Sequence, residues 1–424
     1  MAASNPRAAP ANSCRVVTAG GSLGGLHAAL CLRDVGCEVE VFERSTQELT
    51  SRGAGIVLQP ATVRYFETHG VVRVEDISVP SRWLRYLDRD GSVIYEEASA
   101  FRFTAWNTLY RSFLGLFGLN RYHLGEALAA FAQEQDGVTV QFDSGRQERC
   151  DLLVCADGIA STGRRVLLPD VEPIYAGYVG WRGLVEEREA PRAIFDQFHE
   201  AFTYFQMPDS QILAYPVPSP DGEITPGRRL VNWVWYRNVA PGEELNALMT
   251  DRHGQPRPAS MPPGYVQDRF VAELRQTAER RLPPVFARLV QDTREPFIQP
   301  IVDVEVPRMA FGRVCLIGDA AFAARPHAAA GTAKAAANGW ALAEALQDVS
   351  RDVPAALRRW EPTERELGRE LVRRAREMGD KSQRYGTWKP GDPALKLGLL
   401  PGATRPGVPT SAPGAGQRKP VGRE

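Results

Sequence analysis

The N-terminal segment constrains the fold of this chain more than any other stretch. Residues 14–43 hold a β-branched run, a glycine-rich turn, an amphipathic run and a second apolar run that ends at Glu43. This order predicts a strand, a helix and a second strand, the unit that places a dinucleotide at the helix N-terminus. Glu43 lies 23 residues after Gly20, where such units carry the acid that accepts a hydrogen bond from a ribose hydroxyl.

The turn of this unit departs from the G-x-G-x-x-G pattern at one position. Residues 20–25 read GGSLGG, so that Ser22 holds the second glycine position. Serine is small enough to let a phosphate approach, and the last two glycines let the helix pack closely on the sheet. A purely structural βαβ unit is the alternative to a dinucleotide site. The residues predicted to contact the dinucleotide are Gly20, Ser22, Leu23, Gly25, Glu43 and Arg44.

A second strand-to-helix unit lies near the other end of the chain, in residues 313–346. Its apolar run is followed directly by Gly318 and Asp319, which puts a carboxylate at a strand end, where open α/β sheets bind ligands. After a proline-containing loop, Gly331 opens an alanine-rich helix whose first turn carries little side-chain bulk. Such a helix N-terminus suits a large, partly anionic ligand. A buried βα unit packed through alanines is the alternative.

Three separated motifs together resemble class A flavoprotein monooxygenases, the family with the p-hydroxybenzoate hydroxylase fold. They are the N-terminal unit, the segment LLVCADGIASTGRR at 152–165, and the Gly318-Asp319 segment. The chain resembles one subgroup of that family more closely, that of 2,6-dihydroxypyridine 3-monooxygenase. The likeness spans residues 15 to about 385 and rests on GGSLGGL, YVGWRGLV (178–185), LVNWVWYRNV (230–239), EVPRMAFGRVCLIGDAAF (305–322) and RPHAAAGTAKAAANG (325–339).

The resemblance implies an α/β fold in which a Rossmann-like FAD-binding domain with a parallel sheet carries a second, substrate-binding domain. Alternating strands with Pro/Gly turns between 175 and 238 favour a mixed or antiparallel sheet for that second domain. The predicted boundaries are 13–80, 104–172 and 296–388 for the FAD-binding domain, 81–103 and 173–295 for the substrate-binding domain, and 389–424 for a loosely attached Pro/Gly-rich tail.

Periodicity predicts the elements between the motifs. We expect a hairpin at 82–97, helical structure over 105–134 with a break near Gly118, strands at 138–142 and 150–155 that return to the first sheet, helices over 262–292, a return to the nucleotide domain after 296, and an amphipathic helix at 358–380.

Composition limits which binding partners and which cellular compartment are expected for this protein. Lys plus Arg equal Asp plus Glu at 51 each, so nothing recommends a nucleic-acid or anionic-membrane partner. No run of about 18 apolar residues predicts a membrane span, and residues 1–13 lack the apolar core of a signal peptide. The six cysteines show no metal-type or redox spacing. We therefore expect no metal and a cytoplasmic location.

The resemblance implies FAD as cofactor, NAD(P)H as co-substrate and O2 as oxidant. In the family scheme, NAD(P)H reduces the flavin, and a flavin C4a-hydroperoxide then delivers OH to a hydroxypyridine- or phenol-like ring. Asp319 would accept from ribityl hydroxyls, and the helix that begins at Gly331 would stabilise negative charge on the reduced flavin by roughly 0.3–2 kcal/mol. The further cofactor contacts that the resemblance implies are Arg52, Arg111, Asp157, Pro326 and Thr332.

The chain departs from the broad family at three positions near these contacts. Ala333 stands where the family usually has Asn, and Asn338 where it usually has Asp, with Lys334 as a candidate substitute. Trp106 holds the place of the usual flavin-contacting arginine, whose role is transferred to Arg111. Ser22, Ala333 and Asn338 leave a non-catalytic FAD-fold binding protein open as an alternative.

A base or hydrogen-bond network is expected beside the substrate, because electrophilic hydroxylation is faster on a phenolate-like ring. His327 is the candidate catalytic residue, since histidine can titrate near neutral pH; a structural histidine is the alternative. A tailoring hydroxylase or epoxidase of a larger natural product is the second enzymatic hypothesis. A homodimer is expected by analogy. The predicted substrate residues are Tyr204, Tyr215, Asn232, Trp233 and Gln299.

Overall fold

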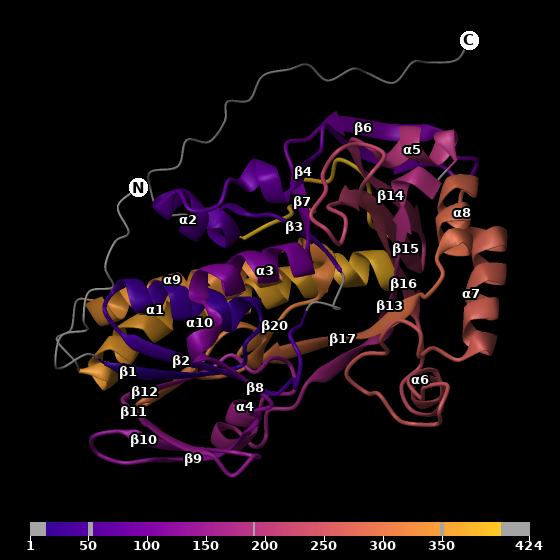
Figure 1. Ribbon diagram of the computed structural model, residues 1–424. Coiled ribbons are helices and arrows are strands. Elements are labelled where there is room, and N and C mark those ends of the chain that lie inside the picture. The colour runs from indigo at the N-terminus through magenta and orange to yellow at the C-terminus, as the bar shows by residue number, and fades with distance from the viewer. Residues whose placement is uncertain (1–13, 50–53, 190, 348–351, 400–424) are drawn as a thin grey trace.

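A six-stranded sheet with a parallel centre forms the base of the molecule. The computed structural model describes residues 14–49, 54–189, 191–347 and 352–399. In the described part the sheet has the order β18-β19-β12-β1-β2-β8, and β1 pairs in parallel with both β12 and β2 (Figure 1). The strands are β1 (Arg15–Ala19), β2 (Glu38–Glu43), β8 (Tyr122–Leu124), β12 (Leu152–Cys155), β18 (Ala310–Phe311) and β19 (Val314–Leu316).

Helices cover one side of this sheet and a small sheet covers the other (Figure 1). Helix α1 packs closely on α9 at Gly339, which has no side chain. A Cβ there would lie only 2.8 Å from the Cα of Ala28. The helices on this side are α1 (Leu23–Asp34), α2 (Pro60–His69), α3 (Trp106–Phe117), α9 (Gly331–Gln347) and the long α10 (Val353–Gln383). The opposite side carries α4 (Thr162–Leu167) and the sheet of β9 (Leu128–Gln133), β10 (Val138–Phe142) and β11 (Gln147–Cys150).

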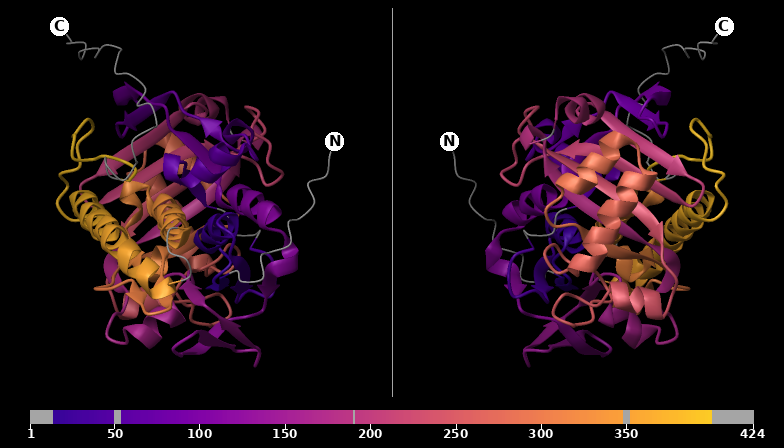
Figure 2. Two further views of the ribbon diagram at one scale, coloured as in Figure 1. Left: turned by 90° about the vertical axis from the view of Figure 1, so that its left-hand side faces the viewer. Right: turned by 90° about the vertical axis from the view of Figure 1, so that its right-hand side faces the viewer.

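An eight-stranded, mostly antiparallel sheet stands beside the first, as the resemblance implied. Its order among the described strands is β20-β17-β13-β16-β15-β14-β5-β6. Helices α7 and α8 lie across one of its faces (Figure 2). The strands are β5 (Trp83–Leu87), β6 (Val93–Ala98), β13 (Ile174–Glu186), β14 (Ala201–Met207), β15 (Ser210–Val217), β16 (Leu230–Asn238), β17 (Phe297–Glu305) and β20 (Phe322–Ala323); the helices are α5 (Arg192–Phe198), α6 (Glu243–Leu248), α7 (Asp268–Arg281) and α8 (Pro284–Asp292).

Short elements complete the chain. A small sheet joins β3, β7 and β4. It contacts the large sheet where Gly55 N–H donates to the Asn232 side-chain oxygen. These elements are β3 (Gly55–Val57), η1 (Val74–Ile77), β4 (Val79–Pro80), β7 (Arg102–Ala105), η2 (Leu119–Arg121), η3 (Glu187–Glu189), η4 (Gly318–Ala320) and η5 (Pro326–Ala328).

Strand β16 divides the two faces of the large sheet in the way its alternation predicted. Trp233 and Trp235 are fully buried in the core shared with α7 and α8, and their indole N–H groups donate to Thr293 Oγ1 and Ser210 Oγ, both at 2.8 Å. Val234 points to the opposite face, as successive strand residues do. That opposite face meets η5 and α10.

The structure overturns several expected elements. The helix expected over 105–134 ends at Phe117, and the chain continues as β8 and β9. The strand at 138–142 belongs to the three-stranded sheet of β9, β10 and β11 rather than to the six-stranded sheet. Strand β17 does not return directly to the nucleotide-binding sheet, because it first pairs with β13. The division into two domains with those boundaries stays a prediction.

The segment after Gly386 is anchored to the rest of the protein at particular residues, in contrast to the expected loose tail. Trp388 is 5% exposed, and its indole N–H donates to the Tyr86 hydroxyl at 3.1 Å. The guanidinium of Arg374 donates to the carbonyls of Lys396 and Gly398. Trp388 and the leucines at 395, 397 and 399 therefore pack with the face of the large sheet that meets η5 and α10. The part of the predicted tail beyond 399 lies outside the described residues.

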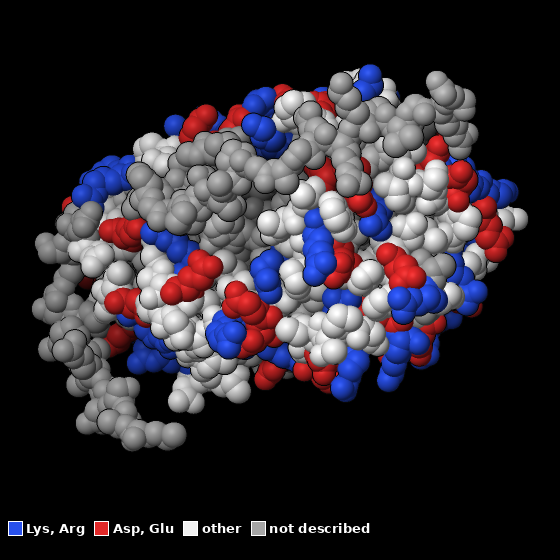
Figure 3. All heavy atoms as spheres, turned by 90° about the horizontal axis from the view of Figure 1, so that it is seen from above, with Lys and Arg blue, Asp and Glu red and all other residues white. Residues whose placement is uncertain are grey.

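Charge is evenly mixed on the face seen in Figure 3. Lys and Arg alternate with Asp and Glu there without a large region of one sign. This mixture agrees with the equal totals of 51 basic and 51 acidic residues.

Candidate active site

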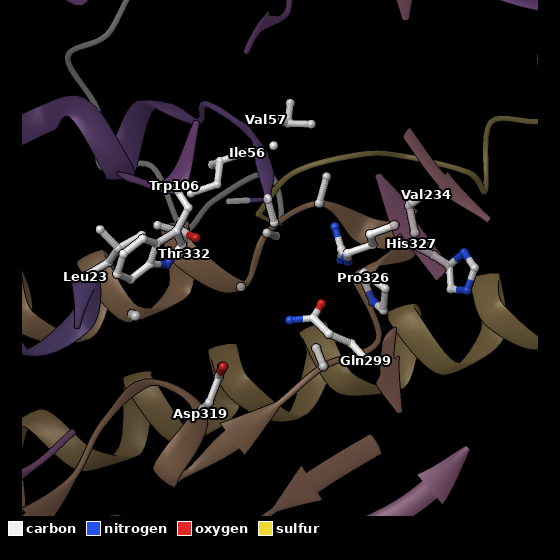
Figure 4. Close-up of a pocket in the computed structure, with 18 of the residues that line it drawn as sticks. Leu23, Ile56, Val57, Trp106, Val234, Gln299, Asp319, Pro326, His327 and Thr332 are labelled. Atoms are coloured by element: carbon white, nitrogen blue, oxygen red, sulfur yellow. The ribbon is translucent and has the colours of Figure 1, made fainter. Parts of the chain in front are cut away.

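A cavity of about 380 Å³ lies between the strand ends of the six-stranded sheet and the large sheet. One end is lined by Ser22, Leu23 and Gly24 at the start of α1, by Asp319, and by the start of α9. The other end is lined by side chains of the large sheet. Figure 4 shows Leu23, Trp106 and Thr332 at the first end and Val234 and His327 toward the second, with Gln299 between them. Residues from distant parts of the chain thus meet in one cavity.

The glycine-rich turn is held in a shape that only glycine permits. Gly20 has a φ of +106°, and a Cβ there would lie 2.3 Å from the Ala156 carbonyl oxygen. Glu43 fixes the turn, because its two carboxylate oxygens accept from the N–H groups of Gly21 and Ser45 at 2.8 and 2.9 Å. Ser22 is the N-cap of α1, yet its side chain makes no capping hydrogen bond, and it lines the cavity.

Of the residues predicted with this turn, Ser22 and Leu23 line the cavity, whereas Gly20, Gly25, Glu43 and Arg44 do not. Glu43 is 5% exposed and supports the turn from behind. Arg44 is exposed beside it. Each oxygen of the Glu43 carboxylate still has a free acceptor position, since each accepts a single N–H of the described chain.

The late strand-to-helix unit places Asp319 at the same end of the cavity. Its side chain is 47% exposed, and its carboxylate lies 3.6 Å from the ammonium of the buried Lys334. Gly331 and Thr332, at the start of α9, line the cavity as predicted from the bare first turn of this helix. Pro326 lines it as well.

The departures in α9 serve packing rather than the cavity. The Asn338 side-chain oxygen accepts from Gly318 N–H at 3.1 Å, and its amide donates to Glu364 at 2.8 Å. Ala333 is 1% exposed and is absent from the cavity lining. Lys334 points to Asp319 and to the Phe322 carbonyl. These positions therefore give no support to a loss of cofactor binding.

The segment at 152–165 reaches the cavity through the backbone of Gly158 rather than through the Asp157 side chain. The Asp157 carboxylate accepts from the Ser161 hydroxyl and from the N–H groups of Thr162 and Gly163 at 2.5–3.1 Å, which caps α4. Gly158 lines the cavity in place of this carboxylate.

The transferred arginine role finds no support in the structure. Arg111 is exposed, donates to the Pro220 carbonyl at 2.7 Å and does not line the cavity. Trp106 lines the cavity instead, with its ring stacked on Tyr110 at 5.0 Å. Arg52 lies outside the described residues.

The large sheet contributes a wall of aromatic residues. Tyr204, Tyr215 and Gln299 line the cavity as predicted. Burial raises the pKa of Tyr204 well above its ordinary value, and it raises the pKa of Tyr236 to about 12. These phenols are therefore protonated at neutral pH and can donate hydrogen bonds.

Two predicted substrate residues do not reach the cavity. Trp233 points to the opposite face of the sheet, into the core under α7 and α8. Asn232 is on the cavity side but lies behind β3, where its oxygen accepts from Gly55 N–H at 2.9 Å. Since neighbouring strand residues point to opposite faces, at most one of this pair could have lined a pocket.

Other cavity residues were missed, although strand register could have found some of them. Arg182 and Leu213 stand directly opposite Val234 on the neighbouring strands, so all three share one face. The cavity residues that sequence reasoning missed on this sheet are Arg182, Phe202, Gln211, Leu213, Val234 and Tyr236.

His327 lines the cavity from η5, and its imidazole is held neutral. Its Nε2 lies 3.0 Å from the Tyr178 hydroxyl, and its Nδ1 is buried without a hydrogen-bond partner in the described chain. Burial, aided by the nearby Arg325 cation, lowers the pKa of His327 to about 3. The prediction of His327 as a base assumed that its imidazole titrates near neutral pH. In this buried position it does not.

Ion pairs fix the loop that carries His327. Arg325 pairs with Asp303 of β17 at 3.1 Å and with Asp380 of α10 at 2.8 Å, and it is 7% exposed. Such a buried, doubly paired arginine sets the relative positions of the sheet, the loop and the helix.

The described ranges contain neither a metal-binding cluster nor a membrane-spanning helix. No group of three His, Cys, Asp or Glu side chains could hold a metal ion there. Among the helices that the structure describes, none has the length and apolarity to cross a membrane.

Comparison with known proteins finds flavin-dependent hydroxylases. A family model described as FAD binding domain-like matches residues 175–303, which run from β13 into β17. The chain is 37% identical over 399 residues to 2,6-dihydroxypyridine 3-monooxygenase of Paenarthrobacter nicotinovorans, covering 94% of this chain and 98% of that protein. It is 27% identical over 384 residues to an FAD-dependent urate hydroxylase of Klebsiella pneumoniae, covering 86% and 90%.

Solved structures agree with these relatives. The structure of 2,6-dihydroxypyridine-3-hydroxylase from Arthrobacter nicotinovorans superposes with a TM-score of 0.88 at 36% identity, over 94% of this chain and 99% of that one. A Klebsiella pneumoniae HpxO variant in complex with FAD superposes with a TM-score of 0.72 at 26% identity, over 88% and 91% of the two chains.

Proposed function

Because the chain belongs to the FAD-dependent aromatic hydroxylases of the class A flavoprotein monooxygenase family, we propose that its substrate is a small hydroxypyridine- or phenol-like ring, hydroxylated with NAD(P)H and O2. One observation carries the proposal. A single cavity has the dinucleotide-type turn and helix start at one end and an aromatic wall at the other.

The residues at the first end fit FAD. The turn at 20–25 leaves room for a pyrophosphate, because its glycines have no side chains and the Ser22 hydroxyl makes no capping bond. The start of α9 presents free N–H groups to the cavity, and the half-exposed Asp319 can accept hydroxyl groups. FAD, when bound, supplies the redox and oxygen chemistry, while the protein supplies position and exclusion of water.

The residues at the second end orient the ring. The Tyr204, Tyr215 and Tyr236 rings enclose it with apolar surface and carry hydroxyl donors. His327 acts as a neutral hydrogen-bond partner of the substrate rather than as a titrating base. Tyr178 fixes the orientation of its imidazole, since the Tyr178 hydroxyl occupies Nε2 and leaves Nδ1 without a partner.

A screen tests the proposal. The purified protein should carry FAD, and 2,6-dihydroxypyridine or a related phenol should stimulate NADH oxidation with formation of a hydroxylated product. His327→Asn should lower kcat/KM by about tenfold, the value of one hydrogen bond to a substrate. His253→Asn, at an exposed position, is the matched control and should have no effect. A protein that carries FAD but responds to no hydroxypyridine or phenol would contradict the proposed substrate class.

A cytoplasmic location and a homodimer complete the proposal. The location is supported by cysteines that are all free in the described chain, five of them buried. The homodimer rests on analogy alone, and light scattering of the purified protein tests it: a single species at the monomer mass would contradict it.

A further inference from the structure

Arg182 is a cation without a partner in the described chain. It projects from β13 into the cavity and is the only Lys or Arg among the described lining residues. Its Nε is buried and makes no hydrogen bond. No acid of the described lining faces it, because Asp319, the only carboxylate among those residues, is at the other end of the cavity and pairs with Lys334. An arginine in such a place leaves strong donors unsatisfied unless a ligand supplies acceptors.

Three other buried arginines are paired within the described chain. Arg229 makes a two-pronged pair with Glu187 at 2.7–2.9 Å. Arg325 pairs with two carboxylates, and Arg164 donates to backbone carbonyls, among them that of Ala320 at 3.1 Å. Arg275 and Arg374 share an unbonded Nε with Arg182, but their other guanidinium nitrogens donate to backbone carbonyls. Arg182 thus differs from arginines that serve structure, and its guanidinium is left for something inside the cavity.

The surroundings of Arg182 fit a planar aromatic anion. Val234 and Leu213 continue its row across the sheet as apolar surface. Tyr215 and Tyr236 lie close enough to feel the charge of Arg182. This charge lowers their pKa values and so partly offsets the increase that burial causes. These neutral phenols can donate to an oxyanion but cannot neutralise the guanidinium.

We propose that Arg182 binds the substrate as an aromatic anion, paired to a ring oxyanion, and so selects the ionised ring over the neutral one. The inference rests on the proposed function and names what that site recognises. When a neutral hydroxyl compound binds, its hydroxyl proton leaves to solvent. The ring then reacts in its more electron-rich form, so that no side chain with a neutral pKa is needed. This agrees with an imidazole at His327 that is neutral and poorly basic.

Binding of two probes to the FAD-loaded enzyme tests this proposal. The first is 2,6-dihydroxypyridine. The second is 4-nitrophenol, whose anion absorbs visible light and therefore reports the ionisation state of the bound ring. The variants are Arg182→Gln, Arg182→Lys, and Arg237→Gln as the matched control, because Arg237 lies on the same sheet but pairs with Glu273 outside the cavity. FAD content and circular dichroism establish that each variant is folded.

The wild-type enzyme should lower the pKa of bound nitrophenol by about one unit or more relative to the free compound. Arg182→Gln should remove this shift and weaken binding of either anion by about 10- to 100-fold, as expected for lost hydrogen bonds to a charged group. Arg182→Lys should retain part of the affinity, and Arg237→Gln should match the wild type.

Equal affinity of the wild type and Arg182→Gln for the anions would overturn the inference. So would absence of any pKa shift in the wild type, or failure of the wild type to bind either probe. Turnover separates this result from the proposed function. A wild type that hydroxylates 2,6-dihydroxypyridine while Arg182→Gln binds it equally well refutes Arg182 alone. A wild type that binds nitrophenolate through Arg182 but hydroxylates no ring refutes the proposed function alone.

Discussion

Replacing Gly25 by Ala should damage the cofactor end of the cavity out of proportion to the size of one methyl group. A Cβ at Gly25 would lie 1.9 Å from the backbone carbonyl oxygen of Gly20 and 3.3 Å from Thr18. Neither the carbonyl oxygen nor the helix start can move aside by changing a rotamer. The start of α1 must therefore shift away from β1, and the turn at 20–25 shifts with it.

Gly115, inside α3, provides the matched control. A Cβ there would have no atom within 4 Å, and the residue does not line the cavity. Both substitutions gain up to about 1 kcal/mol from helix propensity. Overpacking costs about 1–3 kcal/mol at a constrained site. Gly115→Ala should thus stay within about 1 kcal/mol of the wild type, while Gly25→Ala should lose about 1–3 kcal/mol of apoprotein stability.

Urea unfolding of the apoproteins measures the stability difference, and quenching of flavin fluorescence measures FAD affinity. A displaced turn that loses about 1.4 kcal/mol of binding free energy raises the Kd for FAD about tenfold. Gly25→Ala should therefore show both effects and Gly115→Ala neither. Wild-type FAD affinity and stability in Gly25→Ala would refute the idea that this turn holds the cofactor in the described shape.

Three further predictions concern other parts of the site. Asp319→Ala should purify mostly without FAD, because the half-exposed carboxylate at that end of the cavity is lost, and full flavin retention would show that the assignment is wrong. The free energy of unfolding should fall as pH drops from about 6.5 to about 3: burial lowers the pKa of both His27 and His327 from 6.5 to about 3, so the unfolded chain binds more protons over that window. His27→Gln should flatten this dependence, and an unchanged slope would contradict it. Trp233→Phe should cost about 1–3 kcal/mol in urea unfolding through the lost bond to Thr293 yet leave KM unchanged, whereas a raised KM would return Trp233 to the cavity.

Local patterns predicted the parts of the fold that local physics determines. The strand, turn and helix at 14–43 follow from glycine geometry and apolar periodicity, and the structure has β1, α1 and β2 there. The two faces of β16 follow from strand alternation in the same way. The cofactor end of the cavity could be predicted from the sequence for this reason, since its residues lie in short contiguous motifs.

Contacts between distant residues decided the elements that were missed. The run at 122–124 has no local strand signal and becomes β8 because β2 offers a free edge beside it. Trp388 is ordered by the Tyr86 hydroxyl, 302 residues earlier. The Pro/Gly-rich composition of the tail indicates a low propensity for helix or strand. It cannot indicate a contact with a residue so distant in the sequence.

The substrate end shows the same limit. Choosing Trp233 and Asn232 as pocket residues required knowing which face of β16 meets the cavity, and α7 and α8 determine that. The neutral state of His327 depends on burial by Tyr178, Tyr236 and Trp388, which come from three different segments. Residue type alone could therefore indicate a histidine near the ring but not its protonation state.

The central claim is that this chain inserts one atom of O2 into an electron-rich ring. The most direct measurement is mass spectrometry of the product formed from 2,6-dihydroxypyridine and NADH under heavy-isotope O2, with a parallel reaction in heavy-isotope water. The account predicts one labelled oxygen atom per product molecule from O2 and none from water. A new hydroxyl oxygen derived from water, or NADH oxidation that yields only hydrogen peroxide with every ring tested, would contradict it.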